Sequence, residues 1–140
     1  MCGIAGIINI EGAPVYLDQL KKMAKAFAHR GPDGEGFFTD NHLGLAHKRL
    51  AILDISTSGS QPMTSRDGIW TIVFNGCIYN FLQLKQELRA RGHSFNSGTD
   101  TEVIVEGLSA FGTKFLEELN GMFAIAAWNS ESQELFLSRD

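Results

Sequence analysis

Cysteine is scarce in this chain of 140 residues, which contains only Cys2 and Cys77. Two cysteines are too few for a disulfide framework, and free thiols suit a reducing compartment, so the sequence predicts a cytoplasmic protein. Long apolar runs are also lacking, and none approaches the roughly 20 residues that span a bilayer. The first ten residues have no basic start and are soon followed by Glu11 and Pro14, unlike a signal peptide. A membrane partner is therefore not expected.

Clustered positive charge and metal-ligand motifs are lacking as well. The formal net charge is −4, and lysines gather only in the short run Lys21, Lys22 and Lys25. Nucleic-acid binding needs a basic patch or stripe, so a nucleic-acid partner is not expected. The four histidines and two cysteines show no CxxC or HxxxH spacing, and the sequence therefore predicts no metal site.

The composition, with 44% hydrophobic and 20% charged residues, is that of a globular protein. A chain of this length forms one domain with its own core more readily than two. The spacing of apolar residues predicts strands over 3–10, 43–52, 68–76, 122–128 and 134–138, helices over 17–28, 81–91, 100–111 and 114–119, and a loop over HRGPDGEG (29–36). This grouping of strands and helices favours an α+β fold over a doubly wound sheet.

Turn and capping residues separate several of these elements. The dipeptide Asn75-Gly76 predicts a turn at the end of its strand. Asn80 is the expected cap of the next helix, and Thr99 with Glu102 is the expected capping box of the helix after it.

Cys2 has an unusual position, directly after the initiator Met1 and before Gly3. Removal of Met1, which a small second side chain favours, would give one residue both a thiol nucleophile and a free α-amine. A peptide α-amine has a pKa of about 7.7 to 8.0 and can accept the thiol proton directly or through one water. Gly3 permits the close backbone approach that such a site needs. The alternative is that Cys2 is a small, buried apolar residue.

Seven stretches of the chain, in order and at compatible spacing, carry a resemblance. They are MCGIAGI (1–7), HRGPDG (29–34), HKRLAILD (47–54), QPM (61–63), FNGCIYN (74–80), SGTDTEV (97–103) and NGMFAIAAW (120–128). Together they resemble the glutaminase domain of class II glutamine amidotransferases, most closely that of glutamine-hydrolysing asparagine synthetases. The resemblance implies an N-terminal-nucleophile four-layer sandwich, with two antiparallel sheets between helices. It also implies hydrolysis of L-glutamine to glutamate and ammonia.

The resemblance assigns roles to individual residues. Cys2 is the expected nucleophile, and the Asn75 side-chain amide and Gly76 backbone N–H are the expected donors to the oxyanion. Arg49 matches the group that binds the glutamine carboxylate, for which a planar guanidinium is well suited. Asp100 matches the acceptor of the α-ammonium. A plain hairpin turn is the alternative interpretation of Asn75-Gly76.

Four further polar residues of these motifs are expected to have structural roles. His29, Arg30 and Asp33 are expected to order the loop that borders the site. His47 lies beside a run of apolar residues and is expected to be a hydrogen-bonded core histidine.

Cys77 departs from the family pattern, because asparagine synthetases usually have glutamate there. That carboxylate is expected to help hold the substrate ammonium, so Cys77 predicts weaker or altered glutamine binding. This assumes that Cys77 faces the substrate; the alternative is that it points into the sheet as a small apolar residue.

The end of the sequence is the second departure. The chain stops at Asp140 within a segment that continues in relatives, so we expect residues 1–140 to be a glutaminase domain that lacks its last strands. A synthetase domain or subunit would then be its partner. The sequence has no SGGxDS-like phosphate loop, so no cofactor is expected in this chain. ATP and Mg²⁺ would belong to the synthetase part.

Three functions follow from these observations. The first is a glutaminase that supplies ammonia for asparagine synthesis, and the second is the same glutaminase serving another acceptor, such as a sugar. The third is a non-catalytic remnant, against which the presence of Cys2 argues.

Overall fold

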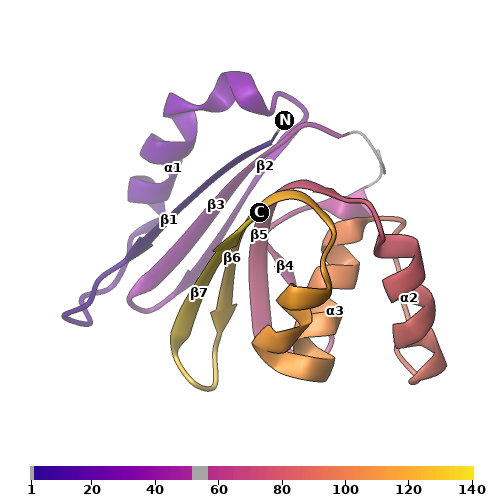
Figure 1. Cartoon of the computed structure of the whole chain (residues 1–140). Coiled ribbons are helices and arrows are strands. Elements are labelled where there is room, and N and C mark those ends of the chain that lie inside the picture. The colour runs from indigo at the N-terminus through magenta and orange to yellow at the C-terminus, as the bar shows by residue number, and fades with distance from the viewer. Residues whose placement is uncertain (1, 52–56) are drawn as a thin grey trace.

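A computed structural model describes residues 2–51 and 57–140 of the chain (Figure 1). Its strands are β1 (Gly3–Ile8), β2 (Gly34–Asp40), β3 (Leu43–Arg49), β4 (Met63–Thr64), β5 (Trp70–Ile78), β6 (Gly121–Asn129) and β7 (Glu134–Arg139). Its helices are α1 (Leu17–Ala26), α2 (Phe81–Ala90) and α3 (Asp100–Phe111), with 3-10 turns at Ala28–Arg30, Thr57–Gly59 and Gly112–Glu118.

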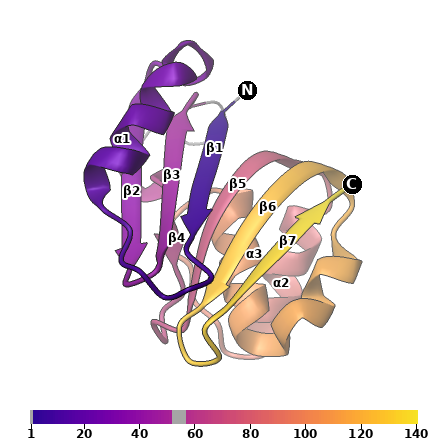
Figure 2. The same ribbon diagram turned by 90° about the vertical axis from the view of Figure 1, so that its left-hand side faces the viewer.

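The strands form two antiparallel sheets that pack face to face (Figure 2). Sheet A has the order β1-β3-β2, and sheet B has the order β4-β5-β6-β7. Helix α1 covers the outer face of sheet A, and α2 and α3 lie on the outer side of sheet B (Figures 1 and 2). The expected α+β sandwich of two antiparallel sheets between helices is therefore confirmed. Across the described ranges, no helix is long and apolar enough to cross a membrane.

Alternation along the strands divides the apolar residues among three cores. Successive side chains of a strand point to opposite faces, so each sheet packs against a helix on one side and against the other sheet on its inner side. The core between the sheets consists of Leu43, Leu45, Val73 and Trp128. The core under α1 consists of Val15, Leu20, Ala24 and Ala46. The core under α3 includes Ile72, Phe74, Ile78, Val103, Ile104 and Leu108.

The loop expected over 29–36 ends earlier than predicted, because β2 begins at Gly34. The two glycines of DGEG suggested a turn, but Gly36 pairs with His47 of β3. A side chain at position 36 would overlap the Gln61 carbonyl, so glycine is required there by close packing rather than by a turn. The expected strand 43–52 ends at Arg49, and its residue 52 lies outside the described residues.

The predicted turn at Asn75-Gly76 is wrong, and so is the hairpin alternative. Strand β5 continues through both residues to Ile78, pairing Gly76 with Phe123 of β6. A Cβ at Gly76 would overlap the Met122 carbonyl oxygen and lie 2.7 Å from the Phe123 Cα. Gly76 is therefore needed because the two strands approach closely.

The capping predictions are partly confirmed. Thr99 Oγ1 accepts a hydrogen bond from the Glu102 N–H at 3.3 Å, but the Glu102 carboxylate accepts from Asn96 and Ser97 N–H groups, both at 2.7 Å, instead of completing a capping box. Asn80 precedes α2 without a side-chain cap. The Asn80 side-chain amide instead donates to the Glu118 carbonyl and accepts from the Asn120 N–H. The helix expected over 114–119 is the 3-10 segment Gly112–Glu118.

Trp128 connects the two sheets through a polar contact as well as an apolar one. Its ring is fully buried, and its Nε1–H donates to the Asp40 Oδ2 of β2 at 2.8 Å. We predict that Asp40→Ala lowers the free energy of unfolding by about 1.5 to 3 kcal/mol, because it leaves a buried donor without its charged acceptor. Asp40→Asn keeps an acceptor for the Trp128 N–H, so its free energy of unfolding should fall clearly less than that of Asp40→Ala. Urea unfolding of both variants tests this, and equal losses would contradict it.

Candidate active site

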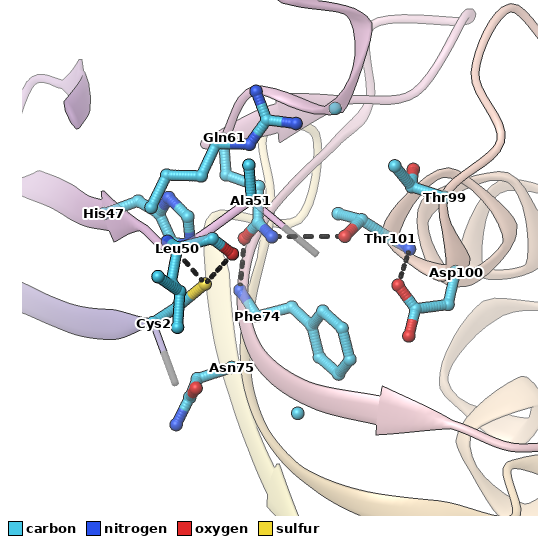
Figure 3. A pocket seen from close by; sticks show the side chains of 13 residues that line it. Cys2, His47, Leu50, Ala51, Gln61, Phe74, Asn75, Thr99, Asp100 and Thr101 are labelled. Atoms are coloured by element: carbon cyan, nitrogen blue, oxygen red, sulfur yellow. Dashed lines mark hydrogen bonds between the residues drawn. The ribbon is translucent and has the colours of Figure 1, made fainter. Parts of the chain in front are cut away.

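A pocket of about 100 Å³ lies where the ends of both sheets meet the start of α3 (Figure 3). Its lining comes from the start of β1, the end of β3, the middle of β5 and the residues around Asp100. The lining residues are Cys2, His47, Arg49, Leu50, Ala51, Gly59, Gln61, Phe74, Asn75, Gly76, Thr99, Asp100 and Thr101. Five of the six predicted site residues therefore meet in one pocket, and Cys77 is not part of its lining.

Cys2 is held by contacts on both sides. Its thiol donates to the Leu50 carbonyl at 3.6 Å and accepts from the Leu50 N–H at 3.4 Å. The Cys2 carbonyl accepts from Arg30 Nε at 3.2 Å. A side chain at Gly3 would overlap the Phe27 ring, so the close approach expected at Gly3 is present. These contacts fix the thiol at the edge of the pocket.

Two residues of the motif at 29–34, Arg30 and Asp33, hold the backbone beside the pocket as expected. Arg30 bonds the Cys2 backbone, and Asp33 Oδ2 accepts the Ala51 N–H at 2.9 Å. The backbone N–H of Asp33 also donates to the Arg49 carbonyl at 3.0 Å. His29 is exposed at the surface.

Arg49 is the last residue of β3, and its guanidinium reaches toward the start of α3. A Cβ at Gly59 would lie only 2.6 Å from Arg49 Nη2 and 2.9 Å from Thr99 Cγ2. The absence of a side chain at Gly59 thus makes room for the guanidinium inside the pocket. A planar group with paired donors in this place suits a carboxylate.

Asp100 is the first residue of α3 and is almost fully buried, with 4% of its surface exposed. Its Oδ2 accepts the Ile78 N–H at 3.0 Å, and its Oδ1 accepts the Thr101 N–H at 3.0 Å. Burial raises the pKa of the carboxyl, although these backbone hydrogen bonds act in the opposite direction. Asp100 thereby joins the start of α3 to the end of β5 and brings an acidic group to the pocket.

The edge of β5 that faces away from β6 presents its amides to the pocket. Alternate N–H groups of a strand point to the same edge. The Phe74 N–H donates to Gln61 Oε1 at 2.6 Å, and the Ile78 N–H donates to Asp100. The N–H of Gly76, which lies between them, points to this same edge. Next to it, Asn75 presents its side-chain amide on the inner face of the sheet, and the Asn75 Oδ1 is buried without a partner among the described residues.

His47 differs from its prediction. It is buried as expected, with 1% of its surface exposed, but neither ring nitrogen has a hydrogen-bond partner among residues 2–51 and 57–140. Burial, together with the positive charge of Arg49, lowers the pKa of His47 to about 4. A hydrogen-bond-like contact between the ring and the Phe74 backbone, whose geometry falls short of an ordinary hydrogen bond, acts in the opposite direction. His47 is thus a neutral imidazole in the same pocket as Cys2.

Cys77 follows Asn75 by two residues and is half-buried on the same face of β5. Its cross-strand neighbour Met122 is 61% exposed, so this part of the face is open. Burial and the negative charge of Asp100 raise the pKa of the Cys77 thiol. Cys77 therefore lies within the electrostatic range of Asp100, although it does not line the pocket.

Gln61 is a pocket residue for which the sequence analysis predicted no role. In addition to accepting from Phe74, its Nε2 donates to Thr101 Oγ1 at 3.1 Å, so this buried side chain connects β5 with α3. The QPM stretch at 61–63 was the available signal. Its spacing alone did not show that the glutamine side chain would lie inside the site.

Comparison with known proteins agrees with this architecture. The family model described as a glutamine amidotransferase domain matches residues 1–140. The chain is 38% identical to asparagine synthetase [glutamine-hydrolyzing] 1 of Bacillus subtilis, covering all of this chain and 22% of that protein. It is 36% identical to asparagine synthetase B [glutamine-hydrolyzing] of Escherichia coli, covering all of this chain and 25% of that protein.

The fold has a counterpart among solved structures. Glutamine phosphoribosylpyrophosphate amidotransferase from B. subtilis superimposes with a TM-score of 0.80 at 20% identity, over 98% of this chain and 37% of that chain. The fold is thus that of a glutamine amidotransferase domain. The chain belongs to the glutamine amidotransferase domain family, and it spans about a quarter of the length of the two asparagine synthetases.

The lowered pKa of His47 predicts a specific pH dependence of stability. The folded state disfavours the charged ring, so this contribution is present above the unfolded pKa of 6.5 and is lost as the pH falls toward 4. The full loss corresponds to roughly 3 kcal/mol. His47→Gln should therefore lose less stability than the parent between pH 7 and pH 4 in urea unfolding. Comparing variant with parent cancels the contribution of Asp100.

The matched control is His29→Gln, because His29 is exposed. The free energy of unfolding of His29→Gln should change with pH in the same way as that of the parent. If His47→Gln also follows the parent, the His47 ring is not held neutral by the fold.

Proposed function

We propose that this chain hydrolyses L-glutamine to glutamate and ammonia, with Cys2 as the nucleophile. The observation that supports this most directly is the meeting of Cys2, Asn75, Gly76, Arg49 and Asp100 around one pocket, although they come from four separate segments of the chain. A pocket with a nucleophile at one side and opposite charges at the other matches an amino acid with an amide side chain.

The two charged groups of glutamine select its orientation. The Arg49 guanidinium binds the α-carboxylate, and Asp100 accepts the α-ammonium. Both lining groups lie near the start of α3, on the side of the pocket formed by Gly59 and Thr99. The carboxamide of the substrate then extends toward Cys2 and the edge of β5.

Cys2 becomes the N-terminal residue by removal of Met1, which lies outside the described residues. The Cys2 amine accepts the thiol proton, and the sulfur attacks the carboxamide carbon. The oxygen that becomes negative receives hydrogen bonds from the Asn75 amide and the Gly76 N–H. Collapse of this intermediate breaks the C–N bond, and the amine returns the proton to the departing ammonia. A γ-glutamyl thioester of Cys2 is left, and water hydrolyses it.

The ammonia is consumed, in this proposal, by an ATP-dependent synthetase domain or subunit, as the names of the two asparagine synthetases suggest. ATP and Mg²⁺ would be held by that synthetase part, and no step here is assigned to them. A sugar or another carboxylate as acceptor is the alternative, because the glutaminase motifs do not identify the acceptor. A reducing compartment, the cytoplasm, completes the proposal.

We predict that the purified chain releases ammonia from L-glutamine and that Cys2→Ala abolishes this release. Coupled measurement of ammonia gives the rate, and circular dichroism shows whether the variant is folded. Mass spectrometry of the active protein should find a chain that begins at Cys2, since a retained Met1 would convert the amine into an amide nitrogen without basicity. A folded Cys2→Ala variant with the parent's rate would refute the assignment.

We also predict that Cys77→Glu lowers KM for glutamine with little change in kcat. A carboxylate at this position would add a second negative charge near Asp100 for the substrate ammonium. The ammonium is remote from the reacting amide, so it is bound equally in the ground and transition states, which changes KM alone.

Cys77→Gln is the matched control, because it adds a side chain of the same length without the charge. The thermal midpoint should be measured alongside the kinetics. An unchanged KM together with a lower midpoint would indicate that position 77 acts in packing and not in substrate binding.

A further inference from the structure

Three buried polar atoms of pocket-lining residues make no hydrogen bond of ordinary geometry with the described residues, although the Phe74 backbone lies close enough to His47 to act on its ring. They are both ring nitrogens of His47 and the Asn75 Oδ1. Buried polar atoms in proteins almost always have a partner, so each exception calls for a functional explanation. Asn75 has a role in the proposed reaction, whereas His47 has none.

His47 marks the inner end of the pocket. It precedes Arg49 by two residues on β3, so the two side chains share a face and their backbones lie about 6.7 Å apart along the strand. The next residue inward on that face, Leu45, belongs to the core between the sheets. In sheet A, His47 pairs with Ile4 and Gly36, neither of which offers a polar side chain. The His47 ring is therefore a polar group at the boundary between the pocket and the apolar core.

The other polar side chain beside His47 is already occupied. Gln61 uses its oxygen for the Phe74 N–H and its nitrogen for Thr101. Figure 3 shows His47, Gln61 and Cys2 on the same side of the pocket, with the Gln61 and Cys2 contacts as dashed lines. A neutral ring has one donor and one acceptor. The donor of His47 has the Phe74 backbone beside it, which leaves the acceptor nitrogen of this pocket-lining residue for a small molecule.

Glutamine itself leaves this position free in the proposed reaction. Its charged groups bind to Arg49 and Asp100, and its amide oxygen binds to Asn75 and Gly76. Departure of ammonia then opens space beside the thioester, where the second reactant, water, must enter. A single acceptor on a neutral imidazole suits a water molecule.

We propose that His47 holds the water that hydrolyses the γ-glutamyl thioester on Cys2. The inference rests on the proposed function and adds a positioning residue to it. One hydrogen of the water is donated to the unprotonated nitrogen of His47, and the other points to the Cys2 amine. The water oxygen attacks the thioester carbon, and its proton passes to the amine. The C–S bond then breaks, the sulfur takes up the proton from the ammonium, and glutamate leaves.

The test separates the two half-reactions in the full chain. Rapid-quench measurement of the first ammonia release reports thioester formation, and steady-state glutamate release with mass spectrometry of intact protein reports its hydrolysis. His47→Leu should keep the rate of the first ammonia release, slow glutamate release by about 100-fold and accumulate the thioester on Cys2. His47→Gln retains an acceptor and should restore most of the turnover. Added hydroxylamine, which needs no positioning, should release the accumulated acyl group as γ-glutamyl hydroxamate.

Each other outcome overturns the proposal. If His47→Leu slows both half-reactions equally and no thioester accumulates, His47 acts in packing or in the first half-reaction. If the rate of glutamate release is unchanged, His47 has no role in the reaction. His47→Ala provides a second apolar variant if His47→Leu does not fold, with the same expected accumulation. A parent chain that releases no ammonia and forms no thioester would instead refute the proposed function itself.

Discussion

The register between β1 and β3 is the constraint on which the site depends. Gly3 pairs with Lys48 and Ile4 with His47, and this places Cys2 beside Arg49 at the end of the ladder. Side chains alternate between faces with a period of two, so a slip of one residue would turn His47 and Arg49 away from sheet B. The core of Leu43, Leu45, Val73 and Trp128 fixes that register, because the same slip would turn both leucines out of this core and toward α1. The apolar packing deep between the sheets thus determines the geometry of the polar end.

The free edge of β5 has an equally specific role. Strand β4 pairs with β5 only at Thr71 and Ile72, so the following amides on that edge have no strand partner. Gln61 takes the first of them and Asp100 takes the last. The amide of Gly76 between them faces the pocket, and the close approach of β6 allows no side chain there. The interruption of the sheet edge after β4 thus leaves a backbone N–H group directed toward the pocket.

The sequence predicted the sandwich and five residues that meet in one pocket, because the motifs carry both. The candidate residues lie in short stretches that are far apart in the sequence, so only the family resemblance predicted that they meet. They are Cys2, Arg49, Asn75, Gly76 and Asp100. Local signals failed where tertiary contacts decide the outcome. Asn75-Gly76 has the composition of a turn but lies within a strand, because β6 packs too closely for any residue other than glycine.

Side-chain partners were the least predictable level. The buried position of His47 was predicted correctly, but whether its ring finds a hydrogen bond depends on groups from β5 and from residue 61, which no local pattern specifies. The same holds for Gln61, whose two hydrogen bonds join elements 13 and 40 residues away.

Asp100 illustrates a conflict between stability and binding. Its raised pKa means that the fold, on balance, disfavours the ionised carboxylate, even with two backbone N–H groups bound to it. Selection for stability alone would therefore favour a neutral side chain at the start of α3. In the proposed reaction the α-ammonium of glutamine would compensate the ionised carboxylate, so a neutral substitute that stabilised the empty protein would weaken glutamine binding.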